Sequence, residues 1–190
     1  MQQAQHYRFL KDAETRDSLK AWWNSLKQKR GDRARLRRAE RPEDVLLTEA
    51  FFNFLQQMPE SWAKPEELLS SAIVAAALSH VKEPQDDGKN FITRLASPKR
   101  AGDKTPRMSE LRFQRLQKSH SPEEFFIRLQ RAIRLSEGKA DVLSLSESIL
   151  HWMSAFNSIP EREPQKRLAV IWAIDYYTAL PKQNKKGEKS

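Results

Sequence analysis

Apolar residues in this chain recur every three or four positions, and this spacing constrains the fold more than any other feature of the sequence. Phe9, Leu19, Trp22, Trp23 and Leu26 follow it near the start of the chain. An α-helix brings such positions onto one face, whereas a half-buried strand requires strict alternation, which is hard to find here. Valine is scarce, and the 190 residues include only five glycines. We therefore predict an all-α protein.

Three helices are predicted in the first half of the chain. The first runs from about residue 6 to residue 30 and ends at Gly31, because glycine favours the conformation that closes a helix. The second starts at Pro42, which suits a first helical position, and stops before Pro59. The third covers residues 61–82. Its middle is apolar nearly all round, so we expect it to be the most buried element.

The second half of the chain contains four further predicted helices. Ser121 caps one of them, with Glu124 completing a capping box and Gly138 closing the helix. Asp141 caps the next. The predicted ranges are 108–119, 121–138, 141–156 and 164–180, the last ended by Pro181.

A segment rich in helix breakers separates these two sets of helices. Residues 83–107 contain three prolines and two glycines, with at most a helical turn at 91–95. We predict two small helical bundles, over residues 1–83 and 108–181, joined by a basic linker over 84–107. Residues 182–190 are predicted to be a disordered polar tail.

Clustered positive charge indicates a polyanionic partner. Residues 27–41 read KQKRGDRARLRRAER, in which eight of fifteen residues are Lys or Arg, and the whole chain carries a net charge of +9. Phosphate backbones and anionic membranes are the usual partners of such a field. Many of the cations are arginines, whose guanidinium fork binds phosphate bidentately. No RNP aromatics, zinc finger or basic zipper is recognisable, which favours binding that ignores sequence.

The basic residues fall into groups that define a predicted nucleic-acid-binding surface. Arg112 and Arg115 share a helix face, and three arginines step by three along the next helix. Two cations open the last helix, where the macrodipole disfavours them, so an external anion is indicated there. The predicted set is Lys29, Arg30, Arg33, Arg35, Arg37, Arg38, Lys99, Arg100, Arg107, Arg112, Arg115, Arg128, Arg131, Arg134, Lys166 and Arg167. A solvated face is the simpler explanation of most single members, and Arg128 has a potential partner in Glu124.

Residues that support catalysis are not arranged in any recognisable pattern. The chain has no cysteine, no glycine-rich phosphate loop and no two histidines at ligand spacing. Asp86 and Asp87 suggest a two-metal nuclease site, but a solvated acidic turn explains them better, since such sites need several carboxylates on rigid elements. We predict no enzymatic activity, no cofactor, no metal ion and no small-molecule ligand.

The sequence also indicates a cellular location. The N-terminus lacks an apolar secretory segment, and the longest apolar run, over residues 72–78, is far too short to span a bilayer. The absence of cysteine fits a reducing compartment. We expect a soluble, cytoplasmic protein that does not contact a membrane.

Two segments carry a family resemblance. Residues 36–55 read LRRAERPEDVLLTEAFFNFL, and residues 108–135 read MSELRFQRLQKSHSPEEFFIRLQRAIRL. With a Trp-containing last helix that ends in Asp-Tyr-Tyr, this order of features resembles the CasB family, the small subunit of the type I-E CRISPR effector complex Cascade. The resemblance covers most of residues 15–180.

The resemblance implies a non-catalytic, all-α subunit with two small helical bundles. It implies that two copies lie beside the guide-backbone subunits and the large subunit of Cascade. There they would help to hold guide-paired target DNA and the displaced strand, stabilising the R-loop. The basic patch of the family maps onto Arg37, Arg38 and Arg112, and less securely onto Arg131 and Arg167. One basic position of the family is Glu66 here, so the patch is not carried over unchanged.

Three rival functions fit the same sequence. A free-standing helical transcriptional regulator would bind duplex DNA with sequence preference. A structural adaptor would dock its basic faces on acidic proteins and bind little nucleic acid. A nuclease would need metal ions and would cleave its substrate.

Overall fold

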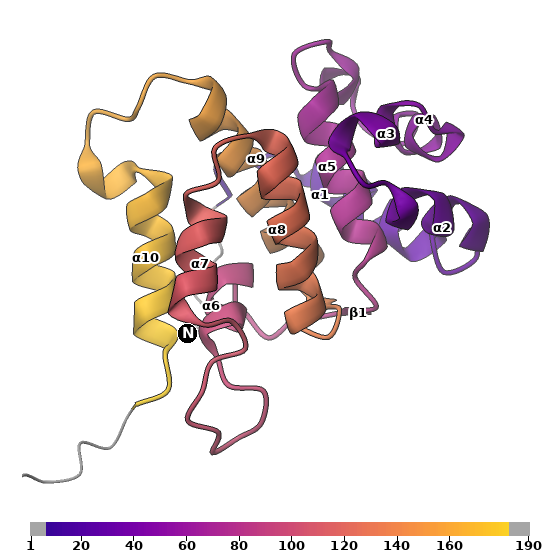
Figure 1. Ribbon diagram of the computed structural model, residues 1–190. Helices are drawn as coiled ribbons and strands as arrows, with labels where there is room; N and C mark the ends of the chain where they lie inside the picture. The colour runs from indigo at the N-terminus through magenta and orange to yellow at the C-terminus, as the bar shows by residue number, and fades with distance from the viewer. Residues whose placement is uncertain (1–6, 183–190) are drawn as a thin grey trace, which may run out of the picture.

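The computed structural model describes residues 7–182, and these form helices with one two-residue strand pair (Figure 1). The all-α prediction is confirmed. The first helix was predicted to start near residue 6, but residues 7–12 are not helical; the helix begins at Ala13, where Asp12 caps it by accepting from the Thr15 amide at 2.8 Å. Residue 6 and residues 183–190 of the predicted tail lie outside the described residues. In chain order the elements are α1 (Ala13–Ser25), α2 (Arg30–Arg38), α3 (Pro42–Leu46), α4 (Glu49–Leu55), a 3₁₀ helix (Glu60–Ala63), α5 (Leu68–Ser79), β1 (Glu83–Pro84), α6 (Phe91–Ala96), α7 (Glu110–Gln117), α8 (Pro122–Leu135), β2 (Lys139–Ala140), α9 (Val142–Asn157), a second 3₁₀ helix (Pro164–Lys166) and α10 (Leu168–Ala179).

Helix α5 occupies the centre of the fold, as its apolar sequence predicted. Every residue from Ser70 to Ser79 is buried, and α2, α3, α4, α8 and α9 all pack against this helix. The buried serine hydroxyls are satisfied locally: Ser71 Oγ donates to the Trp62 carbonyl at 2.8 Å, and Ser79 Oγ donates to the Ala76 carbonyl at 2.6 Å. A helix apolar on all sides is stable only when neighbours cover all its faces, and the other elements supply that cover.

The basic stretch near the start of the chain is a helix, although the predicted helices left residues 31–41 between them as a connection. Helix α1 ends at Ser25, and α2 begins at Arg30 and includes Gly31. Gly31 is absent from the glycines with positive φ among the described residues, so it does not act as a helix stop. Leu36 is completely buried and anchors α2 to the core. Tertiary packing of one leucine therefore overrides the local signal from glycine.

Three further predicted helices are each divided in two. Thr48 starts the new helix α4, because its hydroxyl accepts a hydrogen bond from the Phe51 amide at 3.2 Å. Lys64 is extended and precedes Pro65, which disfavours helical geometry in the residue before it. The last predicted helix is interrupted at Arg167, whose backbone is also extended.

The caps that were predicted for the second half are largely confirmed. Ser121 Oγ accepts from the Glu124 amide at 3.2 Å, and Asp141 accepts from the Ser144 amide. Gly138 closes the turn after α8 with a φ of +77°. The capping box differs in one respect: the Glu124 carboxylate accepts from the amide of His120, one residue before the expected partner.

Residues 84–107 pack against the second half of the chain. Strand β1 pairs in parallel with β2, joining Glu83 to Lys139 and Pro84 to Ala140. Helix α6, at the predicted helical turn, buries most of its side chains against α9 and α10. Buried side chains from both predicted bundles belong to one hydrophobic cluster. The domain boundaries at residues 83 and 108 stay a prediction.

Candidate nucleic-acid interface

Three adjoining surface grooves form a channel lined mainly by basic side chains. The first groove lies along α2, the second between α2 and the end of α8, and the third between α7 and α8. The first and second share Arg37 and Lys82, and the second and third share Arg134. We call this surface the basic channel and define it by Lys27, Arg30, Arg33, Arg37, Lys82, Arg112, Arg115, Arg128, Arg131 and Arg134. Glu137 is the one acidic residue among those lining it.

Helix α2 forms one end of the channel. Arg30, Arg33 and Arg37 are three and four positions apart, so they share a face. Arg33 is half-buried, and its guanidinium donates to the carbonyls of Ser79 at 3.0 Å and Val81 at 2.6 Å, beyond the end of α5. Burial first, and the charge of Arg37 second, lower the pKa of Arg33. Arg33 therefore holds α2 in place, which leaves Arg30 and Arg37 to face the groove.

Helices α7 and α8 form the other end and lie side by side (Figure 1). The inner face of α8 is buried in the core, and its outer face carries the three arginines that step by three. Arg128 forms the predicted ion pair with Glu124 and also donates to the Arg115 carbonyl. Its contacts fix the spacing between the two helices, so that the arginines of α7 and α8 meet in one groove.

The pKa of the His80 imidazole is lowered by burial and by cations from both sides of the second groove. The side chain of His80 is buried beside this groove. Burial, and then the charges of Arg37, Arg134 and Arg33, lower the pKa of its imidazole to about 4. His80 is therefore neutral at pH 7. Arginines of both α2 and α8 lie close enough to His80 to disfavour a positive charge on its imidazole.

Five of the eight channel arginines are free to bind a ligand. Among the described residues, the side chains of Arg30, Arg37, Arg112, Arg115 and Arg131 have no hydrogen bond or ion pair, and all five are exposed. Arg134 has one long hydrogen bond, at 3.4 Å, to Gln130. Exposed guanidinium groups in a row bind successive phosphates of a backbone with little dependence on base sequence.

Eight of the predicted residues line the channel, and the others lie elsewhere. Arg35 pairs with Glu49 at 3.0 Å. Arg107 is half-buried and donates to the carbonyls of Ser97, Pro98 and Lys99, so it fixes its own loop. The remaining residues outside the channel are exposed: Lys29, Arg38, Lys99, Arg100, Lys166 and Arg167.

Sequence reasoning missed Lys82 as a channel residue. It follows the most buried helix and has no basic neighbour in the sequence. The backbone of Lys82 is placed by a hydrogen bond from its amide to the Gly138 carbonyl at 2.8 Å. Because this contact joins residues far apart in the chain, no local pattern could have identified it.

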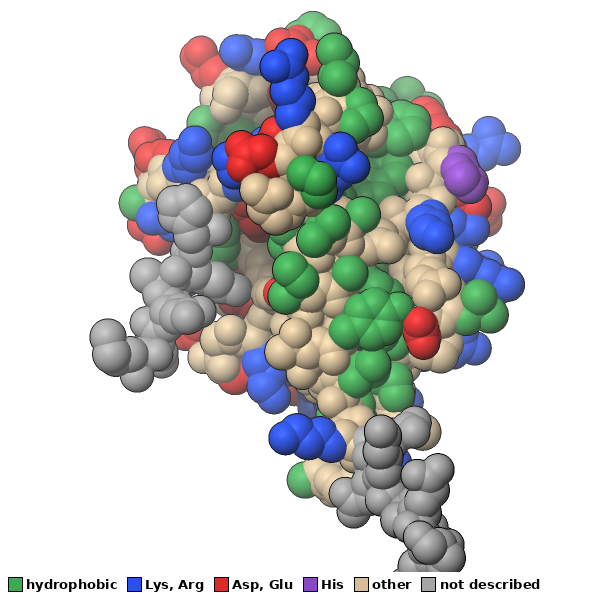
Figure 2. All heavy atoms as spheres, turned by 90° about the vertical axis from the view of Figure 1, so that its left-hand side faces the viewer, with side chains coloured by type: hydrophobic (Ala, Val, Ile, Leu, Met, Phe, Trp, Pro, Cys, Tyr) green, Lys and Arg blue, Asp and Glu red, His purple; other side chains and the backbone are tan. Residues whose placement is uncertain are grey.

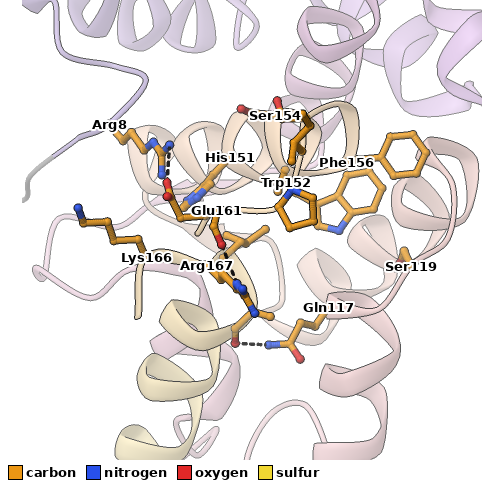
Figure 3. A pocket seen from close by; sticks show the side chains of 16 residues that line it. Arg8, Gln117, Ser119, His151, Trp152, Ser154, Phe156, Glu161, Lys166 and Arg167 are labelled. Atoms are coloured by element: carbon orange, nitrogen blue, oxygen red, sulfur yellow. Dashed lines mark hydrogen bonds and ion pairs between the residues drawn. The ribbon is translucent and has the colours of Figure 1, made fainter. Parts of the chain in front are cut away.

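Lys166 and Arg167 line a separate pocket, shown in Figure 3. We had predicted that they lie in the first turn of the last helix, but they precede α10. Lys166 pairs with Glu163 at 2.5 Å, and Arg167 Nε donates to the Glu161 carbonyl at 2.8 Å. Local partners thus account for part of the charge that the sequence attributed to an external anion.

One member of the acidic pair that suggested a nuclease is engaged in an ion pair. Asp87 pairs with the buried guanidinium of Arg94 at 2.6 Å. Within residues 7–182 no three His, Cys, Asp or Glu side chains are grouped so that they could hold a metal ion. The same residues include no helix long and apolar enough to cross a membrane.

Comparison with known proteins gives one match. A family model described as CRISPR-associated protein Cse2 matches residues 32–177, about three quarters of the chain. The matched region includes most of α2 and all of α7 and α8. No curated protein and no solved structure matches the chain.

Proposed function

Because the chain belongs to the CRISPR-associated Cse2 family, the CasB small subunit of type I-E Cascade, we propose that its basic channel holds nucleic-acid backbone within that complex. The strands held are the guide-paired target DNA and the displaced DNA strand of the R-loop. Binding is sequence-independent, and the role in antiviral defence is not catalytic. This function requires the cytoplasm, where guide RNA and invading DNA meet.

The observation that carries this proposal is the continuity of the channel. Three grooves share their border residues, and along them lie five exposed arginines that have no hydrogen bond or ion pair to any residue from 7 to 182. Each phosphate that such a cation neutralises releases counterions, which supplies affinity without reading bases. A subunit that must accept any target chosen by the guide needs this type of contact.

Modest contacts are sufficient for this role. R-loop formation exchanges a DNA duplex for an RNA–DNA duplex of similar stability, so contacts of the protein with the backbones can decide the balance. The channel supplies such contacts and also neutralises the repulsion between strands that lie close together.

A second surface fits the membership of a complex. Figure 2 shows the side of the molecule that α10 occupies, where hydrophobic side chains gather between the charged ones. Leu111 is 57% exposed, Ile174 58% and Tyr177 45%. We infer that other Cascade subunits, namely the guide-backbone subunits, the large subunit or a second copy of this chain, cover this face.

The runner-up function is a free-standing DNA-binding regulator. The channel is present in either case, so the discriminating property is sequence preference. A regulator would select one duplex sequence when purified alone, whereas a Cascade subunit acts on whichever strands the guide selects.

Target binding by the purified guide–protein complex tests the proposal. The complex is assembled with the chain, without it, and with a variant in which Arg37, Arg112 and Arg131 are changed to Ala. We expect omission to weaken binding and the variant to reproduce part of that loss. Unchanged binding after omission would refute the proposed function.

A further inference from the structure

A pocket beside the C-terminal end of α9 combines cations with an aromatic surface (Figure 3). It has a volume of about 340 Å³ and lies between the end of α9, the loop that follows it, and the start of α10. In Figure 3, Arg8 and Lys166 lie at one end of the pocket, and Trp152 and Phe156 lie at the other. The basic channel shares none of its lining residues with this pocket.

The aromatic end of the pocket is formed by a stack of three rings, of which Phe156 is the last. Phe125 and Trp152 are parallel, with ring centroids 4.0 Å apart, and Phe156 stacks on Trp152 at 5.3 Å with an interplanar angle of 11°. Phe125 and Trp152 are buried, but Phe156 is 45% exposed. The stack therefore ends in a ring that is held in orientation from below and open to the pocket. A flat aromatic ligand can extend the stack by one ring.

The other end of the pocket carries positive charge that its carboxylates neutralise only in part. Arg8 lies 3.9 Å from Glu161, a long ion pair, and Lys166 pairs with Glu163 at 2.5 Å. Arg167 uses Nε for a backbone carbonyl, and no hydrogen bond or ion pair involves its terminal nitrogens among the described residues. His151, between the two ends, is neutral at pH 7, because burial, then the charge of Arg8, lower its pKa to about 4. The cationic end therefore favours a ligand with negative charge.

We propose that this pocket captures one nucleotide of an unpaired DNA strand, with its base stacked on Phe156 and its phosphate at Arg8, Lys166 and Arg167. The inference rests on the proposed function, because the R-loop supplies an unpaired strand. A base within a duplex is already stacked on both faces, so the pocket selects single-stranded DNA. We name it the nucleotide pocket. Its role differs from that of the basic channel, which contacts backbone only.

The test is binding of a short fluorescent oligothymidine by the purified full chain at about 50 mM salt, where electrostatic binding is strong. A matched oligonucleotide has abasic sites in place of every base. Stacking of one base is worth about 1–3 kcal/mol, so Phe156→Ala is expected to weaken binding of the normal strand about fivefold or more. Binding of the abasic strand should not change. Phe52→Ala is the matched control, because Phe52 is 56% exposed on α4 and lines none of these grooves or pockets.

Two further variants distinguish stacking by an aromatic ring at position 156 from simple apolar packing there. Phe156→Trp keeps an aromatic surface and is expected to bind at least as well as the unaltered chain. Phe156→Leu keeps apolar packing and should lose affinity as the alanine variant does. Circular dichroism confirms that each variant is folded.

Each outcome is decisive for the nucleotide pocket. An equal effect of Phe156→Ala on normal and abasic strands overturns it, as does failure of the unaltered chain to bind the oligonucleotide. The proposed function is judged by a different measurement, target binding by the assembled complex, so the two can fail independently.

Discussion

Removal of three channel arginines should change how target binding responds to salt. The channel variant changes Arg37, Arg112 and Arg131 to Ala. These side chains are exposed and have no hydrogen bond or ion pair among the described residues, so their loss removes charge without breaking internal contacts. One residue comes from α2, one from α7 and one from α8, so the variant samples the length of the channel.

The size of the effect follows from counterion release. If each arginine contacts one phosphate, the slope of log affinity against log salt becomes shallower by about 2.1 on single strands and about 2.7 on duplex. Between about 50 and about 200 mM salt, the unaltered complex should then lose about 20- to 40-fold more affinity than the variant complex. Fluorescence anisotropy of a labelled target, titrated with assembled complex at several salt concentrations, measures both slopes.

A charge-matched control shows whether position or net charge is responsible. Lys11, Lys20 and Lys118 are exposed, are not among the predicted binding residues and do not line the channel. Their change to Ala removes the same three charges. We expect this control to keep most of the slope of the unaltered complex. Equal loss of slope in the two variants would show that the general charge of the chain, and not the channel, drives binding.

Three predictions concern stability, each measured by urea unfolding. Gly138→Ala should lower the free energy of unfolding by about 1–3 kcal/mol, since the φ of Gly138 is +77° and an added Cβ would lie 3.1 Å from the His80 carbonyl oxygen. Gly88→Ala is the control. The φ of Gly88 is +72° and an added Cβ would have no atom within 4 Å, so this variant should lose only the conformational part, about 1–2 kcal/mol. Stability should fall as pH drops from about 6.5 to about 4, because the folded-state pKa values of His80 and His151 both lie at about 4, below the ordinary value of 6.5, so protonation favours the unfolded chain. His80→Gln should remove about half of this dependence and leave the part that His151 contributes. Tyr176→Phe should lower the free energy of unfolding by about 1–3 kcal/mol, because the buried carbonyl of Met108 loses the hydroxyl that donates to it at 2.6 Å. Tyr177→Phe should cost less, because Tyr177 is exposed.

Local rules predicted the helix content and most caps, because those features depend on neighbours in the chain. Ser121 and Asp141 cap the helices that they were expected to cap. These rules failed where contacts between residues far apart in the chain determine whether a segment is helical. Gly31 remains helical because Leu36, five residues later, is buried in the core.

The candidate site was predictable by residue type but not by arrangement. The sequence shows that arginines step along one face of α8, yet it does not show that Arg37 on α2 approaches the same groove as Arg134. Half of the predicted cations lie outside the channel, since charge density in a sequence carries no information about which surface each residue joins. The exposed ring of Phe156 gave no signal at all, because its position at the end of a stack depends on Phe125 and Trp152.

The two ends of the basic channel are built from opposite halves of the chain, and this has a thermodynamic consequence. Gln130 on α8 donates to the Ala39 carbonyl after α2 at 3.4 Å, so the halves meet beneath the channel. A strand that contacts both ends at once binds only the arrangement in which the halves are packed together. Its free energy of binding is then added to that of the internal packing. A strand held at both ends would therefore stabilise the packing of the two halves against each other.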